Sequence, residues 1–583
     1  FAKTKFPNTK ADLFSMFIER CLCLGVTDSS LGFVTPFTWM FISSYEKLRN
    51  ILFTNQSITT LVKPSYHCFF ESAIVPLVTF TIQKSIENIR GSYIDLGYLG
   101  SAESQPIKLL DAIHSSESDM KYLACKDDFK QIYGSPIAYD VSKKLRNAFS
   151  SYKTLGEISD ARQGLATTDN DRFLRLWSEV NLTGIGFSFG NIKEAQQSGL
   201  KWFPYNKGGA FRKWYGNQEY IVNWENDGQE IKENILRKYL YLKTPDFVAK
   251  NTSYYFQPSV SWSFISSSSF GVRYYPEGFI FDVSGSSVFS EDNQRYSVAS
   301  FLCSKLASKM MKIMNPTLNF QVGNVVNLPY KSVDNFFAET LISNSKLDWD
   351  CYEYSWEFQG SPLISELSND QNLKSIYVNW QQQKSSIITE MQRLEEDNNR
   401  LLIDAYGLED EFSPEVSLEQ ITLTVNPKYR YGGKLSDEEL DSRFQSDTLA
   451  ELISYSIGCM MGRYSLDKEG LVYAHAGNEG FSELEQQGAY NTFPADHDGI
   501  IPLTDQEWFE DDVTLRFREF VQTVWCKENL QANLDFVAES LCLHSIKPKS
   551  GETSLETIRR YLSNQFYKDH LKTYKKRPIY WLF

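Results

Sequence analysis

The chain is organised around residues 156–330, which contain the segment Lys201-Trp-Phe-Pro-Tyr-Asn-Lys207-Gly-Gly-Ala-Phe-Arg212-Lys213-Trp214. This segment places four cations among aromatic side chains and holds no acidic residue. Cations neutralise phosphates, and Arg, Asn and Gln can bond to base edges. The segment therefore predicts a nucleic-acid-binding surface, and a half-exposed hairpin is the alternative interpretation.

Further landmarks follow in order along the same residues. They open on Gly156-Glu-Ile-Ser-Asp-Ala-Arg162-Gln-Gly-Leu-Ala-Thr167-Thr-Asp169-Asn170 and continue through Phe270-Gly-Val-Arg273-Tyr274 and Asn315-Pro316-Thr317-Leu318-Asn319-Phe320-Gln321. This ordered set resembles the target-recognition domain of type IIG restriction-modification proteins. It resembles more closely the PglX family of BREX phage-defence adenine methyltransferases, and this second resemblance covers essentially the whole chain.

Six residues of this region are candidates for contact with double-stranded DNA: Lys207, Arg212, Lys213, Arg273, Asn319 and Gln321. We expect the first three to touch phosphates, because they stand in the unopposed basic segment. The other three are expected to read bases, since Arg pairs with guanine and Asn or Gln with adenine through two hydrogen bonds. For Asn319, burial in the domain core is the alternative.

Composition limits the kind of protein and the kind of DNA contact. The 583 residues are 42% hydrophobic and 15% aromatic, which is typical of a folded chain of about three to five domains. The net charge of −14 argues against one uniformly basic face. Any contact with DNA is therefore expected in a confined basic cleft.

Cysteine usage and hydropathy predict a cytoplasmic protein. The nine cysteines are dispersed and form neither a C-x-x-C pair nor a zinc-ligand spacing, so we expect reduced thiols and no metal site. No apolar run reaches the roughly 18 residues of a membrane helix, and the N-terminus lacks the features of a signal peptide. The sequence thus predicts no membrane partner.

The N-terminal part alternates helical and strand-like segments. Apolar residues have helical spacing over 12–22 and 48–52, and strand-like runs cover Gly32–Trp39, Ile58–Val62 and 69–82. This alternation predicts an α/β sheet with parallel members. The resemblance implies the later half of a Rossmann-like fold that binds S-adenosylmethionine and methylates adenine N6.

In the family, the glycine-rich cofactor loop and the Asn-Pro-Pro-Tyr catalytic loop lie upstream of the matching segment. Because the chain begins at Phe1 rather than Met, we expect a fragment that binds no S-adenosylmethionine and transfers no methyl group by itself. Gly184-Ile-Gly186-Phe-Ser-Phe-Gly190 has one residue too many for a dinucleotide loop. Asn426-Pro427-Lys428-Tyr429 carries Lys where a second Pro should stand, which predicts a turn.

One aromatic residue of the methyltransferase part has an implied role. Adenine must leave the duplex for its N6 to be methylated, and the extruded base is held by stacking on an aromatic ring. By the resemblance, Phe70 holds the target base, with Phe69 as its neighbour. An ordinary core phenylalanine is the alternative.

The remaining segments predict helices and a solvated acidic face. Apolar residues three, four and seven apart from about Asn372 indicate a long helical spacer, and Asp447 is a candidate N-cap. Acids near Asp496 and Asp512 lack the ordered arrangement of a nuclease site. We expect four parts: 1–150, half a methyltransferase domain with a connector; 151–345, an α+β recognition domain; 346–405, a helical spacer; and 406–583, a mainly helical domain.

The resemblance implies site-specific DNA adenine-N6 methylation in BREX-type phage defence. In that hypothesis the chain supplies target recognition and part of a Rossmann-like α/β methyltransferase fold. The implied partners are double-stranded DNA, other BREX defence proteins and phage anti-restriction proteins. A non-catalytic specificity or docking module of a defence complex is the alternative.

Overall fold

The computed structural model describes most of the chain: residues 2–65, 76–85, 87–97, 99, 103–115, 118–265, 269–317, 319–334, 337–365, 372–474 and 480–580. The chain divides into two compact units. Unit 1 comprises residues 1–160, 304–333 and 401–413, and unit 2 comprises residues 161–303, 334–400 and 414–583. Residues 151–160 and 304–333 of the expected recognition domain thus pack in unit 1, while the rest of that region shares a unit with the C-terminal helices.

Unit 1 contains a mixed five-stranded sheet. Its strands, in the order β1-β3-β2-β4-β5, are β1 Ser30–Pro36, β3 Leu77–Gln83, β2 Ser57–Lys63, β4 Gly91–Asp95 and β5 Lys121–Ala124. β2 and β4 are parallel, and the other neighbouring pairs are antiparallel. The expected α/β sheet with a parallel pair is present, but most of its pairing is antiparallel.

The helices of unit 1 are α1 Ala2–Lys5, α2 Leu13–Leu24, α3 Glu46–Asn55, α4 Gln105–His114, α5 Lys126–Lys130, α6 Lys143–Ser151, α11 Lys305–Met314 and α12 Val322–Val326. Asp12 accepts the N–H of Leu13 at the start of α2. Trp39 and Phe80 meet in the core beneath the sheet, with ring centroids 4.7 Å apart. Arg49 is buried beside them and donates to the carbonyl oxygens of Trp39, Ile42 and Gly134.

The beginning of the recognition region is anchored within unit 1. Leu155 N donates to Leu328 O at 2.8 Å, and Tyr330 N donates to Lys153 O at 2.8 Å. A Cβ on Gly156 would lie 3.0 Å from the side chain of Val326, so glycine permits this close approach. The first and last landmarks of residues 156–330 therefore lie together.

Unit 2 contains two four-stranded sheets. One has the order β11-β10-β13-β6, with β11 Val272–Tyr275, β10 Ser259–Trp262, β13 Ser287–Phe289 and β6 Asp160–Arg162. The other has the order β12-β8-β9-β7, with β12 Ile280–Phe281, β8 Trp202–Asn206, β9 Tyr220–Asn223 and β7 Leu174–Leu176. An aromatic core that includes Tyr205, Phe256 and Phe281 lies beside the second sheet. The quoted basic segment supplies β8 and the loop that follows it.

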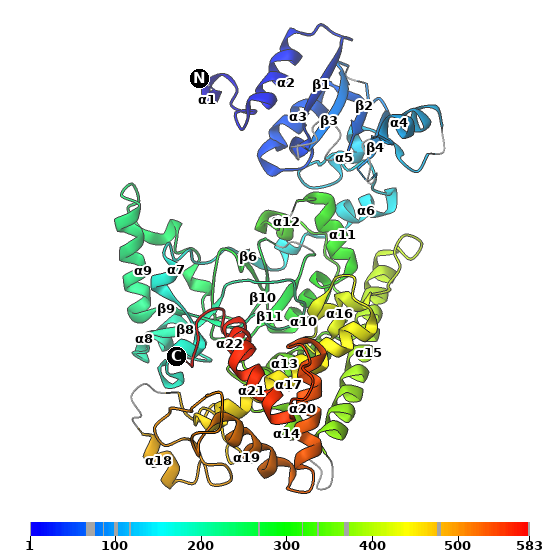
Figure 1. Cartoon of the computed structure of the whole chain (residues 1–583). Helices are drawn as coiled ribbons and strands as arrows, with labels where there is room; N and C mark the ends of the chain where they lie inside the picture. Colours follow the sequence, from blue (N-terminus) through cyan, green and yellow to red (C-terminus); the bar gives the residue numbers. More distant parts are fainter. Residues whose placement is uncertain are drawn as a thin grey trace. The chain divides into compact units, whose positions relative to one another are not determined.

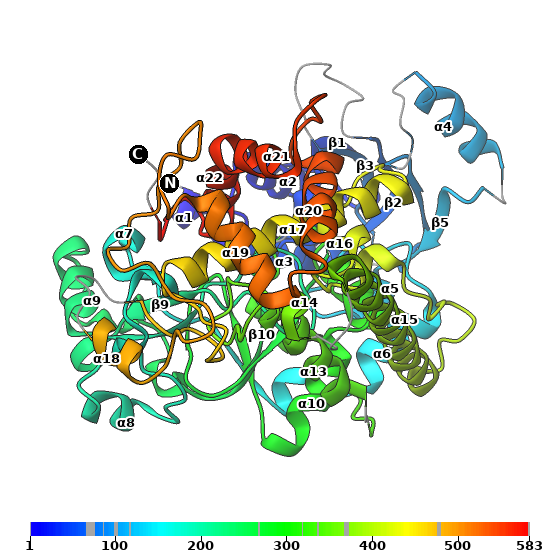
Figure 2. The ribbon, with the colours of Figure 1, turned by 60° about the horizontal axis from the view of Figure 1, so that its bottom comes forward.

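The helices of unit 2 form two groups. Beside the sheets lie α7 Asn170–Phe173, α8 Ile192–Gln197, α9 Glu225–Lys238 and α10 Asp292–Leu302, and Figure 1 and Figure 2 both place α7 and α9 next to β9. The second group is α13 Phe337–Asp350, α14 Pro362–Ser365, α15 Leu373–Tyr406, α16 Pro427–Tyr431, α17 Asp437–Met460, α18 Phe481–Gln486, α19 Val513–Trp525, α20 Leu530–His544, α21 Ser554–Tyr561 and α22 Tyr567–Thr573. α15 begins where the spacing predicts the long helix, and its last turn belongs to unit 1.

Two local predictions for unit 2 are corrected by the structure. Ser436 caps α17, and Asp447 lies inside that helix, where its carboxylate accepts the hydroxyl of Tyr431 at 2.8 Å. Asn426 is not simply part of a turn, because its side chain accepts the N–H of Lys428 and caps the short helix α16. Among the described residues, no helix is long and apolar enough to span a membrane.

Candidate nucleic-acid interface

Two of the four cations of the basic segment 201–214, Arg212 and Lys213, are buried pairing groups rather than part of a charged surface. The side chain of Arg212 is 8% exposed and lies 3.5 Å from Asp348, which is 3% exposed. Its guanidinium also donates to Thr422 O and to Thr424 Oγ1 at 3.2 and 2.8 Å. Arg212 therefore joins the recognition region to α13 and to the segment before α16.

Lys213 is the second buried cation of the segment. Its ammonium group forms a close ion pair with Glu395 of α15, and both side chains are almost fully enclosed. The other oxygen of Glu395 accepts the indole N–H of Trp214 at 2.8 Å. Trp214 has a left-handed backbone with φ of 69°, a conformation that costs a bulky residue of order 1–3 kcal/mol. The contacts to Glu395 help to hold this conformation.

Arg273 of β11 is completely buried. Its guanidinium donates to Arg212 O at 3.3 Å and to Ser263 Oγ at 3.1 Å. A guanidinium enclosed in this way cannot reach a phosphate or a base edge. The expectation of DNA contact is therefore corrected for Arg212, Lys213 and Arg273, which hold unit 2 together from inside.

Lys207 keeps a partly exposed position. Its ammonium group lies 2.7 Å from the carboxylate of Asp282, and its side chain is 27% exposed. Asp282 is buried and also accepts the hydroxyl of Tyr205 at 2.6 Å. Lys207 therefore has a resident anion, and a phosphate would have to compete with Asp282.

The two amide candidates lie in unit 1, whereas the four cations lie in unit 2. Asn319 is exposed, so burial in the core does not describe it. Gln321 is partly buried at the start of α12, and its carbonyl oxygen accepts the N–H of Asn324 at 3.0 Å. Phe70 and its neighbour Phe69 lie outside the described residues. Base reading by Asn319 and Gln321 and stacking by Phe70 stay predictions.

The glycine-containing motif of residues 163–170 is held tightly against β12. A Cβ on Gly164 would lie 1.8 Å from the carbonyl oxygen of Phe281, so only glycine fits there. Leu165 N donates to the same oxygen at 2.8 Å. Thr167 Oγ1 donates to Asn170, and Asp169 caps α7 by accepting the N–H of Arg172. The motif is thus a rigid loop.

An exposed basic and aromatic surface lies beside this loop and was not predicted. Residues 237–251 contain four cations and one acid. We define the α9 surface by its exposed members: Arg237, Lys238, Leu240, Tyr241, Lys243 and Phe247. Leu240, Tyr241 and Phe247 are 88%, 76% and 68% exposed. In the sequence, the run Arg237-Lys-Tyr-Leu-Tyr-Leu-Lys243 indicates this surface, since cations flank four consecutive large side chains that do not follow the spacing of a helix with one buried face.

Hydrogen bonds join the α9 surface to the motif loop. Lys238 Nζ donates to Thr168 O at 2.8 Å, and Asn234 Nδ2 donates to Thr168 Oγ1 at 3.0 Å. At the other end, Asn251 Nδ2 donates to Gln163 O at 2.8 Å. The cations of the α9 surface therefore stand on a fixed scaffold beside the most ordered part of the quoted motif.

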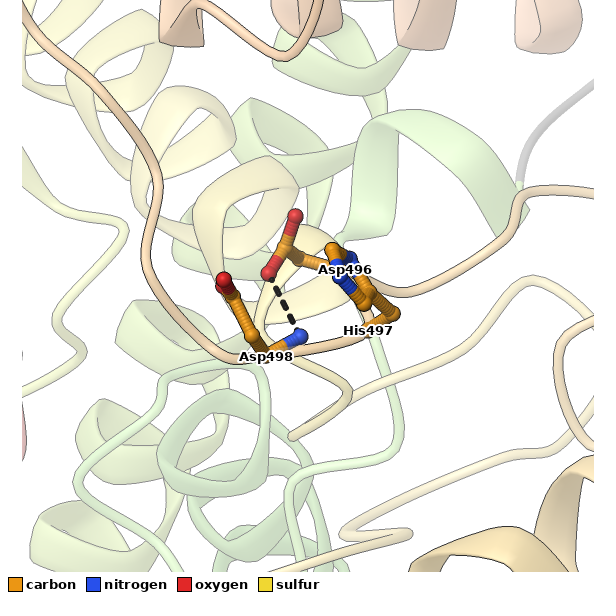
Figure 3. Close-up of side chains that lie close together, drawn as sticks. All are labelled: Asp496, His497 and Asp498. Atoms are coloured by element: carbon orange, nitrogen blue, oxygen red, sulfur yellow. Dashed lines mark hydrogen bonds between the residues drawn. The ribbon is translucent and has the colours of Figure 1, made fainter.

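The acidic segment contains a turn that resembles a ligand cluster. Asp496, His497 and Asp498 bring their polar atoms within 4.8 Å of one another, as Figure 3 shows. One oxygen of Asp496 already accepts the N–H groups of Asp498, Gly499 and Ile500. The carboxylate therefore stabilises a surface turn, which agrees with the expected solvated acidic face.

Comparison with known proteins adds the family. A model described as Eco57I restriction-modification methylase matches residues 2–70. The chain is 42% identical over 594 residues to the adenine-specific methyltransferase BrxX of Escherichia coli O9:H4 (strain HS), covering 100% of this chain and 47% of the relative. It is 35% identical over 599 residues to the adenine-specific methyltransferase PglX of Lacticaseibacillus casei (strain Zhang), with the same coverage. By sequence, the chain is similar along its whole length to adenine-specific methyltransferases of the PglX family. The predicted resemblance is confirmed.

The chain spans about half the length of the curated relatives it matches. Among solved structures it is similar to the type IIL restriction-modification enzyme MmeI in complex with DNA, at 10% identity and a TM-score of 0.42, covering 74% of this chain and 54% of MmeI. It is also similar to the type IIG restriction endonuclease BpuSI, at 13% identity and a TM-score of 0.24, covering 67% and 49%.

The glycine-rich segment 184–190 does not fit a cofactor loop. A Cβ on Gly186 would lie 2.5 Å from the ring of Phe203, so this glycine permits packing against β8. The segment also belongs to unit 2, outside the sheet of unit 1. Among the described residues, this segment therefore offers no cradle for S-adenosylmethionine.

Proposed function

We propose that this chain supplies target recognition and part of the catalytic fold to a site-specific DNA adenine-N6 methyltransferase of a BREX-type phage-defence system. The observation that carries the proposal is 42% identity along the whole chain to an adenine-specific methyltransferase. Methyl transfer would use S-adenosylmethionine bound by residues outside this chain. Phe70 remains the candidate for stacking on the extruded adenine. Other BREX proteins and phage anti-restriction proteins are further candidate partners.

The proposed surface for phosphate contact is the α9 surface, in place of the buried cations Arg212 and Lys213. Its three cations are exposed, and a single acid lies among residues 237–251. Phosphate contacts fix the position of a protein on the duplex and release counterions. The exposed rings of Tyr241 and Phe247 add apolar groups of the kind that pack against sugars or wedge between bases. The α9 surface therefore combines cations that can bind phosphate with apolar rings.

Base reading is assigned to residues that present free edges. Asn319 is exposed and keeps its candidate role, and Gln321 stands next to it at the start of α12. Each bidentate contact between an amide and adenine contributes about 1–3 kcal/mol of discrimination. In this proposal, loss of a phosphate contact weakens binding to all sequences, while loss of an amide changes the sequence preferred.

The test of the α9 surface uses the full-length protein with Arg237, Lys238 and Lys243 all changed to Ala. Binding to a duplex is followed by fluorescence anisotropy over a range of salt concentrations. Each lost phosphate contact lowers the slope of log affinity against log salt by about 0.9, so the triple variant should lose roughly two to three units.

The matched control changes three exposed cations of unit 2 that lie elsewhere in the chain, Lys434, Lys527 and Lys547, to Ala. It removes the same net charge, so a general electrostatic effect would appear in both variants. An unchanged slope in the α9 variant, or an equal fall in the control, would reject this surface. Adenine methylation by the full-length protein separates the enzyme from the alternative of a non-catalytic module.

A further inference from the structure

A cavity of about 370 Å³ lies within unit 2. Its wall is formed by residues 351–363, α15, α16, α17 and the last helices of the chain. Aromatic side chains dominate the wall: Tyr352, Tyr354, Trp380, Tyr431, Tyr455 and Tyr561. The volume is within the range of about 300–1,000 Å³ that small-molecule sites occupy.

Several wall residues carry polar atoms without a hydrogen-bond partner among the residues that the structure describes. Tyr352 and His570 are 7% and 2% exposed, and the Tyr352 hydroxyl and His570 Nδ1 make no bond. His570 Nε2 accepts the N–H groups of Ile579 and Tyr580, so Nδ1 carries the proton and is an unused donor. Glu353 Oε1 and Arg430 Nη1 are also unpaired. Buried polar groups are nearly always bonded, so this wall lacks partners that a ligand would provide.

The charges of the wall nearly balance. The carboxylates are Glu219, Glu353, Asp447, Glu451 and Asp569, and the cations are Arg430, Arg443, Lys572 and Lys575. Glu219 is paired with Lys575, and Glu451 with Arg430 at 2.6 Å. Burial raises the pKa of Glu353 to about 7 and also raises the pKa of Asp569. An anionic ligand would therefore lie near carboxyl groups and a cationic ligand near guanidinium groups, so the wall favours a neutral ligand.

An irregular helix shapes one side of the cavity. Between α21 and α22, residues Leu562–Phe566 form a π-helical turn. Tyr561 and Phe566, which flank and end this turn, both line the cavity. Wider helical turns of this kind occur frequently at functional sites. This irregular turn is a second feature that agrees with a binding site.

We infer that this cavity binds a neutral, planar nitrogen heteroaromatic of nucleobase or nucleoside size. Such a ligand has a π-face for the aromatic wall and presents both hydrogen-bond donors and acceptors along its edge. Residues of the wall carry both kinds of group, because Arg430 and His570 have unused donors and Glu353 has an unused acceptor. A purely apolar ligand would leave these atoms unpaired, and an ion would not suit the balanced charge. This site is separate from the methylated base and from the proposed DNA contact.

The test uses the full-length protein, photolabelled with 2-azidoadenosine in the presence of excess S-adenosylmethionine to occupy a methyltransferase site. Labelled peptides are located by mass spectrometry. The inference predicts label in peptides that contain Tyr352, Trp380 or Tyr561. Excess adenosine should suppress this label, and excess ribose should not.

Two variants distinguish a ligand site from adventitious labelling. Tyr352→Phe removes an unpaired hydroxyl, so the fold should be unaffected while adenosine affinity falls about three- to tenfold. Ala450→Phe places a ring where Ala450 lines the cavity and should abolish labelling. Tyr296→Phe, at a residue outside this wall, is the matched control. Absence of label from the wall peptides, or labelling unchanged in both cavity variants, overturns the inference and indicates that only water occupies the cavity.

Discussion

The most informative single substitution is Lys213→Met, because the sequence and the structure predict different consequences. Lys213 and Glu395 form a buried ion pair in which the side chains are 8% and 3% exposed. Removing the cation leaves the Glu395 carboxylate inside unit 2 with the Trp214 indole as its remaining hydrogen-bond partner among those described above. Breaking one partner of a buried pair costs about 3–5 kcal/mol. We expect Lys213→Met to destabilise unit 2 by that amount.

A double substitution separates the cost of leaving the Glu395 carboxylate unpaired from the cost of losing the lysine side chain. Glu395→Gln keeps an oxygen for the Trp214 indole and removes the unpaired charge, so Lys213→Met with Glu395→Gln should recover most of the lost stability. Glu390→Gln, at an exposed position of the same helix, is the control and should change stability by less than about 0.5 kcal/mol.

The assay is chemical unfolding of the full-length protein, followed by the fluorescence of tryptophan, together with DNA binding of the folded variants at several salt concentrations. The buried pair predicts a lower unfolding midpoint and an unchanged salt slope. An unchanged midpoint with a salt slope reduced by about 0.9 would show that Lys213 touches phosphate, and would refute the structural role.

Two further predictions concern a carboxyl group and a glycine. Burial raises the pKa of Glu353 to about 7, above the roughly 4.3 of an unfolded glutamate. The folded state therefore favours the protonated carboxyl group, and the free energy of unfolding that this group contributes at low pH is lost as the pH rises toward 7. Glu353→Gln should therefore gain stability relative to wild type between pH 5 and pH 8, by up to roughly 3 kcal/mol, and a difference independent of pH in unfolding experiments would contradict this. Gly164→Ala should destabilise unit 2 by more than about 2 kcal/mol, because its Cβ meets the Phe281 carbonyl oxygen, whereas Gly323→Ala has open space around it and should be nearly neutral by thermal unfolding.

The sequence was sufficient where periodicity and local chemistry decide the structure. The helix from Leu13, the strand at Ser57–Lys63 and the long helix from Leu373 follow apolar spacing, because each buries a face against its own neighbours. The family resemblance could also be predicted, since the order of the motifs can be read along a single chain. The strand pairing of the sheet was harder to predict, because strand direction depends on connections between segments that are distant in sequence.

The predicted phosphate contacts of Arg212 and Lys213 are corrected because the partners of both residues come from distant segments. Arg212 and Lys213 stand in a run without acids, but their carboxylates are Asp348 and Glu395, more than 100 residues away along the chain. A local charge count therefore mistook an internal network for a surface. The exposed cations Arg237 and Lys243 share a run with leucines and tyrosines, which are usually buried, whereas Leu240 and Tyr241 are exposed in the structure.

The most direct test of the central claim is the map of N6-methyladenine in the host genome, compared between cells with and without the full-length protein. We expect methylation at one sequence motif that is absent without the protein and restored by the wild-type form. With Asn319→Ala or Gln321→Ala, we expect the motif to change at one position. An identical methylation map in cells that lack the protein would show that it is not a site-specific adenine methyltransferase.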